Sequence, residues 1–127
     1  MTIPPTVEEA MRIVSAIDLS GLMARLALPA TGAGWTDEEA LLAEREYRRF
    51  LALHLLHPGV PLTPSKLVDQ VWHAHILDTR NYERDMRTVL GRFLHHDAHT
   101  AGPAPSPEAE AAAWERTRQL YRAAFET

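Results

Sequence analysis

The sequence contains no cysteine among its 127 residues. That absence excludes disulfide scaffolds, thiolate zinc fingers, iron–sulfur clusters and cysteine nucleophiles. A fold of this chain must therefore be held by packing or by metal ligands without sulfur. A chain of this length predicts one domain, 1–127, with a sizeable core.

An excess of positive charge is also lacking. One lysine and twelve arginines are set against 17 acidic residues, so the formal net charge is −4. The nearest basic cluster, Arg45, Arg48 and Arg49, is interleaved with glutamates, as is typical of a solvated helix face. Because nucleic-acid binding needs a basic surface, we expect no nucleic-acid partner.

Long apolar runs are absent as well. No stretch of the chain approaches the roughly 20 apolar residues that cross a bilayer. The first ten residues lack the basic start and apolar stretch of a signal peptide. We therefore expect no membrane partner and a cytoplasmic location.

The alternation that marks β-strands is missing too. No segment of five or more residues alternates apolar and polar positions with β-branched content. Most of the chain instead shows helical spacing, interrupted by proline and glycine. These patterns predict an all-α fold, a compact single-domain bundle of five or six helices.

Capping residues mark the expected helix boundaries. Four residues are placed to cap helix starts: Thr6, Thr36, Ser65 and Ser106. The first two each begin a Thr-x-x-Glu pattern, which predicts a capping box. Gly91 suits the left-handed position that ends a helix. Residues 92–105 are expected to form a polar loop before the last helix, and three histidines lie in it.

What the chain does have is a cluster of histidines. All seven lie between His54 and His99. In the predicted helix over 66–78, each residue advances by about 100°, which places His75 in an apolar stripe that faces the core. His73 lies about 200° further round, one turn after Asp69. In a regular helix, His73 and His75 therefore cannot bind the same metal ion.

Two candidate metal sites compete in this geometry. The first combines Asp69 and His73 with a histidine from the following loop, which is His95, His96 or His99. The second combines His75 with Trp72 and His54. Imidazole binds zinc, iron, copper and nickel, and a carboxylate with two histidines leaves coordination positions open for water or substrate.

The same residues also have ordinary structural explanations. Asp69 and His73 have the i,i+4 spacing of a hydrogen-bonded pair on a helix. A histidine at position 75, on an apolar stripe, is more often a core residue than a ligand. His54 and His57 lie at a helix end, where a cationic side chain interacts favourably with the helix dipole.

One stretch of the chain resembles a known family. The matching elements are Val-Asp-x-x-Trp-His-x-His-Ile-Leu-Asp-Thr at 68–79, Tyr82, Gly91-Arg92-Phe93, and the pair His95-His96. They resemble the signature of the glycine-rich domain-containing protein-like family, and the string at 46–53 extends the similarity over about 35–96. The resemblance implies a characteristic constellation of Asp69, Trp72, His73, His75, Tyr82 and His96.

This chain departs from that family's pattern at two places. Met86 stands where many relatives carry a cysteine, so no activity of this chain can depend on that thiol. Relatives often continue past the second histidine with proline and an aromatic residue, whereas residues 97–99 here are Asp-Ala-His.

The leading hypothesis is a small histidine/carboxylate metal-binding protein, which leaves open whether the metal serves an enzymatic reaction. The expected metal is a divalent transition ion, iron or zinc. Its expected ligands are Asp69, His73 and His96, with His75 either a fourth ligand or a residue that orients the ligands. Residues expected around them or facing a substrate are Trp72, Tyr82 and His95, with Tyr82 donating to a bound oxygen species. The alternative is a non-catalytic helical protein-interaction domain with structural histidines. The partner, a small molecule or a protein, is not specified by the sequence.

Overall fold

The computed structural model describes residues 5–30, 32–96 and 105–126, and this part of the chain contains six α-helices and no strand. In chain order the helices are α1 (Val7–Ser15), α2 (Ser20–Ala27), α3 (Asp37–Leu56), α4 (Lys66–Leu77), α5 (Thr79–Leu90) and α6 (Pro107–Phe125). The predicted all-α class is confirmed, and the number of helices lies within the predicted range.

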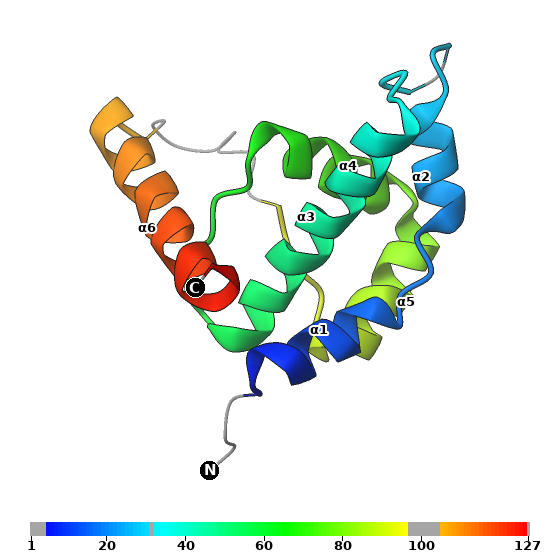
Figure 1. Ribbon diagram of the computed structural model, residues 1–127. Helices are drawn as coiled ribbons and strands as arrows, with labels where there is room; N and C mark the ends of the chain where they lie inside the picture. The colour runs from blue at the N-terminus through cyan, green and yellow to red at the C-terminus, as the bar shows by residue number, and fades with distance from the viewer. Residues whose placement is uncertain (1–4, 31, 97–104, 127) are drawn as a thin grey trace.

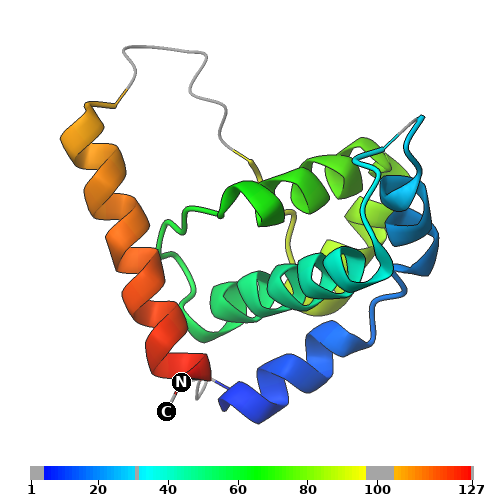
Figure 2. The ribbon, with the colours of Figure 1, turned by 45° about the horizontal axis from the view of Figure 1, so that its top comes forward.

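The long helix α3 lies at the centre of the arrangement (Figure 1). It packs against α1, α2, α4 and α6, while α4 also packs against α2 and α5. Figure 2 shows α6 on the opposite side of α3 from α2, and among the described helices α6 packs closely against α3 alone. Helices α3, α4 and α5 therefore carry the buried residues around His54 and His75.

The helix starts form where the capping residues predict them. Thr36 accepts a hydrogen bond from the Glu39 backbone and the Glu39 side chain accepts one from the Thr36 backbone, which completes a capping box. At α1 the Thr6 hydroxyl accepts from the Glu9 backbone and donates to the Glu9 carboxylate, whereas the bond from the Thr6 backbone that would complete the box is absent between these two residues. Gly91 ends α5 with φ 71°, a left-handed conformation that glycine adopts without strain.

The core is built around one face of α3. Its largest fully buried apolar and aromatic side chains are Tyr47, Tyr82, Leu19, Leu51, Leu53, Met86, Val14 and Val71. Fully burying an aliphatic or aromatic side chain contributes roughly 1.5–3 kcal/mol before the conformational entropy of folding is subtracted. Two tyrosines in this set carry hydroxyl groups that need partners when buried.

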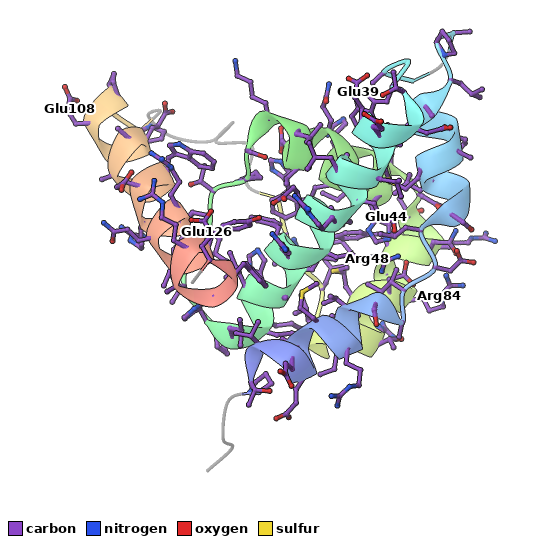
Figure 3. The ribbon with its side chains drawn as sticks, in the orientation of Figure 1. Glu39, Glu44, Arg48, Arg84, Glu108 and Glu126 are labelled. Atoms are coloured by element: carbon purple, nitrogen blue, oxygen red, sulfur yellow. The ribbon has the colours of Figure 1, made fainter. Side chains whose placement is uncertain are left out.

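Some polar side chains on the outer surface of the helices pair with one another or with the end of a neighbouring helix. Glu44 and Arg48 are neighbours on α3, and the Arg48 guanidinium also donates to the Val14 carbonyl oxygen of α1 at 2.7 Å (Figure 3). In the described residues, no helix is both long enough and apolar enough to cross a bilayer. Of the predicted loop, 92–96 is non-helical, and residues 97–104, with His99 among them, lie outside the described residues.

Candidate functional site

His73 and His75 are two residues apart in the sequence but lie on different faces of α4. The Ser65 side chain caps the helix by accepting from the Val68 backbone. With the helix started there, His75 lies on the buried face and is 2% exposed, whereas His73 is exposed. The two imidazoles therefore occupy different environments, as the helical angle of about 200° predicts.

The His75 ring is hydrogen-bonded at both nitrogens. Its Nε2 lies 2.9 Å from the Asp85 Oδ2, and its Nδ1 lies 2.6 Å from the Tyr47 hydroxyl. Because a carboxylate only accepts, Nε2 carries the proton and Nδ1 accepts from Tyr47. Burial lowers the pKa of His75, although the hydrogen bond to Asp85 opposes this effect. His75 is thus a neutral core residue with no ring nitrogen left for a metal, and the expected ligand role does not fit this geometry.

Sequence reasoning missed both partners of His75. Tyr47 lies on the buried face of α3, which suggested a packing residue and nothing more. Asp85 lies on the buried face of α5 with Tyr82, Met86 and Val89. Because a carboxylate on an apolar helix face needs a buried partner, the position of Asp85 in the sequence could have indicated such a contact. The exposed Arg84, labelled in Figure 3, contacts the second oxygen of Asp85 at 3.3 Å.

A second buried chain of hydrogen bonds joins α4, α5 and the segment after α5. The Trp72 Nε1 donates to the Tyr82 hydroxyl at 2.9 Å, and that hydroxyl donates to the Leu94 carbonyl oxygen at 2.5 Å. Burial raises the pKa of Tyr82 to about 12, so the hydroxyl keeps its proton at neutral pH. Tyr82 is fully buried and its hydroxyl is already engaged. The expectation that it donates to a bound oxygen species is therefore not supported by its position.

At the surface, Asp69 and His96 come together from distant parts of the sequence. The His96 Nε2 donates to the Asp69 Oδ1 at 2.5 Å, and the two side chains are 28% and 47% exposed. The His96 ring stacks on Trp72, with ring centroids 4.3 Å apart and planes inclined by 28°. Of the three loop histidines that the sequence offered as partners of Asp69, His96 is thus the one that contacts it among the described residues.

The other predicted site residues do not join this pair. His73 is exposed, and no hydrogen bond or ion pair links it to the described residues. His95 is exposed and packs edge-on against Phe93, with centroids 4.8 Å apart. Within 5–30, 32–96 and 105–126, no group of three or more His, Asp or Glu side chains is placed so that it could hold a metal ion.

His54 lies in the core of the same region. Its ring packs edge-on against Phe50 at 4.8 Å and lies 6.3 Å from the Trp72 ring. Among the described residues its buried Nε2 finds no hydrogen-bond partner. Burial, with a smaller effect of Arg92, lowers the pKa of His54 to about 4. The expectation that His54 acts as a cation at the helix end is wrong, because the ring is neutral at physiological pH.

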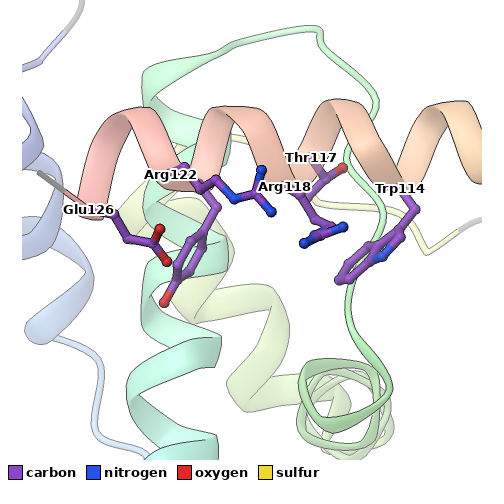
Figure 4. A pocket seen from close by; sticks show the side chains of 6 residues that line it. Trp114, Thr117, Arg118, Arg122 and Glu126 are labelled. Atoms are coloured by element: carbon purple, nitrogen blue, oxygen red, sulfur yellow. The ribbon is translucent and has the colours of Figure 1, made fainter.

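A shallow hollow of about 260 Å³ lies along α6 (Figure 4). Its lining residues are Trp114, Thr117, Arg118, Tyr121, Arg122 and Glu126. A smaller hollow of about 80 Å³ lies where α6 meets α3 and the start of α4. Neither hollow is lined by a residue that the sequence singled out for metal binding.

Comparison with known proteins corrects the family resemblance. The model of the UCP032817-like family matches residues 13–120 of the chain. The Trp-His-x-His string that suggested the glycine-rich domain-containing protein-like family lies inside this match, so the expectation of that family is wrong. Searches of curated proteins and of solved structures found no match.

Proposed function

The chain belongs to the UCP032817-like family, and we propose that it is a small histidine/carboxylate metal-binding protein with a surface site at Asp69, His73 and His96. All three residues lie inside the region matched by the family model. The metal we propose is a divalent transition ion, zinc or iron. A cytoplasmic location belongs to the same proposal.

The observation that carries this proposal is the contact between Asp69 and His96. A carboxylate oxygen and an imidazole nitrogen meet across 27 residues of sequence, and both side chains are partly open to solvent. These are the donor atoms that zinc and iron take in proteins. A metal ion would take the place of the shared proton, with a modest increase in the distance between the two atoms. The Trp72 ring supports the imidazole from one side, so His96 loses little conformational freedom on binding.

His73 is the proposed third ligand. It follows Asp69 by one helical turn, a spacing that places the Cβ atoms about 5–6 Å apart on one helix face. The side chain is exposed, and exposed side chains change rotamer within nanoseconds, so it is able to turn towards a bound ion. Two imidazoles and one carboxylate leave coordination positions open for water or a substrate. Such a site supplies Lewis-acid chemistry when the metal is bound.

Calorimetric titration of untagged protein with Zn²⁺ and, without oxygen, with Fe²⁺ tests this function. We expect one ion per chain for at least one of the two metals. Because Asp69→Asn, His73→Ala and His96→Ala each remove a ligand, each should weaken binding at least about tenfold. His95→Ala is the matched control, since it removes an exposed neighbouring imidazole outside the site. Substoichiometric binding, or binding that survives all three ligand variants, would refute the proposal.

A second candidate function is a non-catalytic helical protein-interaction domain whose histidines are structural. The specific observation in its favour is the buried His75, bonded to Tyr47 and Asp85, because a fully satisfied ring serves folding and not chemistry. On this hypothesis, neither metal binds in the titration, and a chelator leaves the thermal stability unchanged. The partner would then be another protein. The variants at Asp69, His73 and His96 would still bind that protein if these three residues lie outside the interface.

A further inference from the structure

His96 lies at the end of a segment with little regular structure of its own. Gly91 ends α5, and no backbone–backbone hydrogen bond joins residues 92–96 to the rest of the described chain. A side chain on such a segment does not hold a fixed position unless something else anchors the backbone. The contact between Asp69 and His96 therefore needs an explanation beyond the two residues themselves.

The anchor in the structure is Leu94, two residues before His96. Its side chain is buried, and its carbonyl oxygen accepts a hydrogen bond from the Tyr82 hydroxyl. The same hydroxyl accepts from Trp72, whose ring stacks on His96. Tyr82 thus holds both the backbone before His96 and the orientation of the ring beneath it.

These contacts close a circuit through the proposed site. Asp69 and Trp72 both belong to α4, so the helix fixes the carboxylate relative to the indole. Tyr82, on α5, joins that indole to the backbone at Leu94. The backbone then carries His96 back to Asp69. Asp69, Trp72, Tyr82, Leu94 and His96 are thus connected in a closed set by hydrogen bonds, by the stacked rings of Trp72 and His96, and by short lengths of backbone.

We infer that Tyr82 is the positioning residue of the Asp69–His96 site and that its hydroxyl sets the place of the His96 imidazole without touching a bound ligand. The expected effect of Tyr82 on metal affinity rests on the proposed function. The positioning of His96 by Tyr82 does not, because it needs no metal ion. Its high pKa keeps the Tyr82 hydroxyl a donor throughout the neutral range. Residues that orient a metal ligand commonly change metal affinity about 10–100-fold when they are replaced.

The test compares Tyr82→Phe with Tyr47→Phe. Both tyrosines are fully buried, and each substitution deletes one buried hydroxyl. The Tyr47 hydroxyl bonds to His75, whose ring packs edge-on against Tyr82 but makes no hydrogen bond to Tyr82, Leu94 or His96, so Tyr47→Phe is a matched control for the general cost of losing such a group. Two properties are measured in the wild type and in both variants: the Zn²⁺ affinity by calorimetry, and the tautomer and hydrogen bonding of the His96 ring by ¹⁵N NMR.

We expect Tyr82→Phe to weaken Zn²⁺ binding at least about tenfold and to remove the preference of the His96 ring for the Nε2–H tautomer, while Tyr47→Phe keeps both properties. Equal behaviour of the two variants would overturn the inference. A wild-type chain that binds no Zn²⁺ or Fe²⁺ would refute the proposed function alone, and the NMR comparison would still decide whether Tyr82 positions His96. If Tyr82→Phe does not fold, Leu94→Ala loosens the same anchor from the other side and should have the same effect on His96.

Discussion

The histidines of this chain differ in what surrounds their ring nitrogens. His75 has a partner at each nitrogen, and His54 has a buried nitrogen without one among the described residues. His96 bonds to a carboxylate at the surface, while His73 is open to solvent. Because the cost of changing an imidazole depends on its buried partners, replacements of these residues should have very different consequences.

Replacing His75 should be the most damaging of these changes. His75→Leu leaves the Tyr47 hydroxyl and the Asp85 carboxylate buried without their partner. Leaving a buried polar group without its hydrogen-bond partner in this way costs roughly 1–3 kcal/mol of unfolding free energy for each group. Urea denaturation at pH 7 measures the loss. The exposed His73→Leu is the control and should stay within about 0.5 kcal/mol of the wild type. A loss below about 1 kcal/mol for His75→Leu would contradict the structural role of this network.

His54 should make the folded state sensitive to acid. Its pKa is about 4 in the folded chain, against an ordinary value of 6.5. The unfolded state therefore binds more protons between these values, so the free energy of unfolding decreases as the pH falls from 6.5 towards 4. His54 alone contributes up to about 2 kcal/mol of loss between pH 6.5 and 5. His75, with its pKa also lowered, acts in the same direction.

Urea denaturation at pH 7 and pH 5 checks this contribution. His54→Leu removes the titrating group and should lose less stability between the two pH values than the wild type does. The exposed His95→Leu should keep the wild-type dependence, because its imidazole is solvated in both states. An unchanged pH dependence in His54→Leu would show that other groups account for the acid sensitivity.

At the scale of elements, α6 is attached differently from the other helices. Thr117 is its one buried residue, although the helix runs over 19 residues. The attachment is largely polar: the Thr117 Oγ1 accepts from the Thr63 backbone at 2.8 Å, and the Tyr121 hydroxyl donates to the Glu46 carboxylate at 2.5 Å. The Arg49 guanidinium also donates to the Tyr121 hydroxyl at 2.7 Å. A helix with so little buried surface should open at lower free energy than α3 does.

Thr117→Val should loosen α6 while leaving α3 to α5 intact. The substitution keeps the shape of the side chain but removes the acceptor for the Thr63 N–H, at a cost of roughly 1–3 kcal/mol. Hydrogen exchange of α6 amides should become faster than in the wild type, with little change in α3. Thr88→Val is the control, because the exposed Thr88 hydroxyl bonds only within its own helix, to Arg84. Unchanged exchange in α6 would mean that this bond does not hold the helix.

At the scale of the whole molecule, the proposed site exists only when the chain is folded. Asp69 lies on α4 and His96 follows α5, so packing of these two helices is needed to bring the side chains into contact. A ligand that binds the folded chain and not the unfolded chain stabilises the fold by mass action. Metal binding and global stability should therefore be coupled in this protein.

Zn²⁺ should raise the free energy of unfolding in proportion to the logarithm of its concentration above the dissociation constant. At one hundred times that constant, the increase is about 2.7 kcal/mol, provided that the unfolded chain does not bind the metal. Urea denaturation with Zn²⁺ or with a chelator measures the increase. Asp69→Asn is the control and should show little of it. The same increase in wild type and in Asp69→Asn would place the metal elsewhere.

Most of the fold follows from local patterns along the chain. Helical spacing, the capping residues and Gly91 predict the helices, because a helix satisfies its backbone within the segment and its ends are chosen by neighbouring residues. The separation of His73 from His75 follows from the same local geometry. The family did not follow from the short string, because the family model that matches the chain extends over residues 13–120.

The partners of the site residues were decided by the tertiary structure. Periodicity places His75 inside but does not say that Tyr47 and Asp85 will meet it, since that depends on how α3, α4 and α5 pack. Nor does it choose His96 over His95, because two adjacent residues on a non-helical segment have no preferred face. The choice depends on the buried Leu94 with its bond to Tyr82, and on the Trp72 ring of α4, on which His96 stacks.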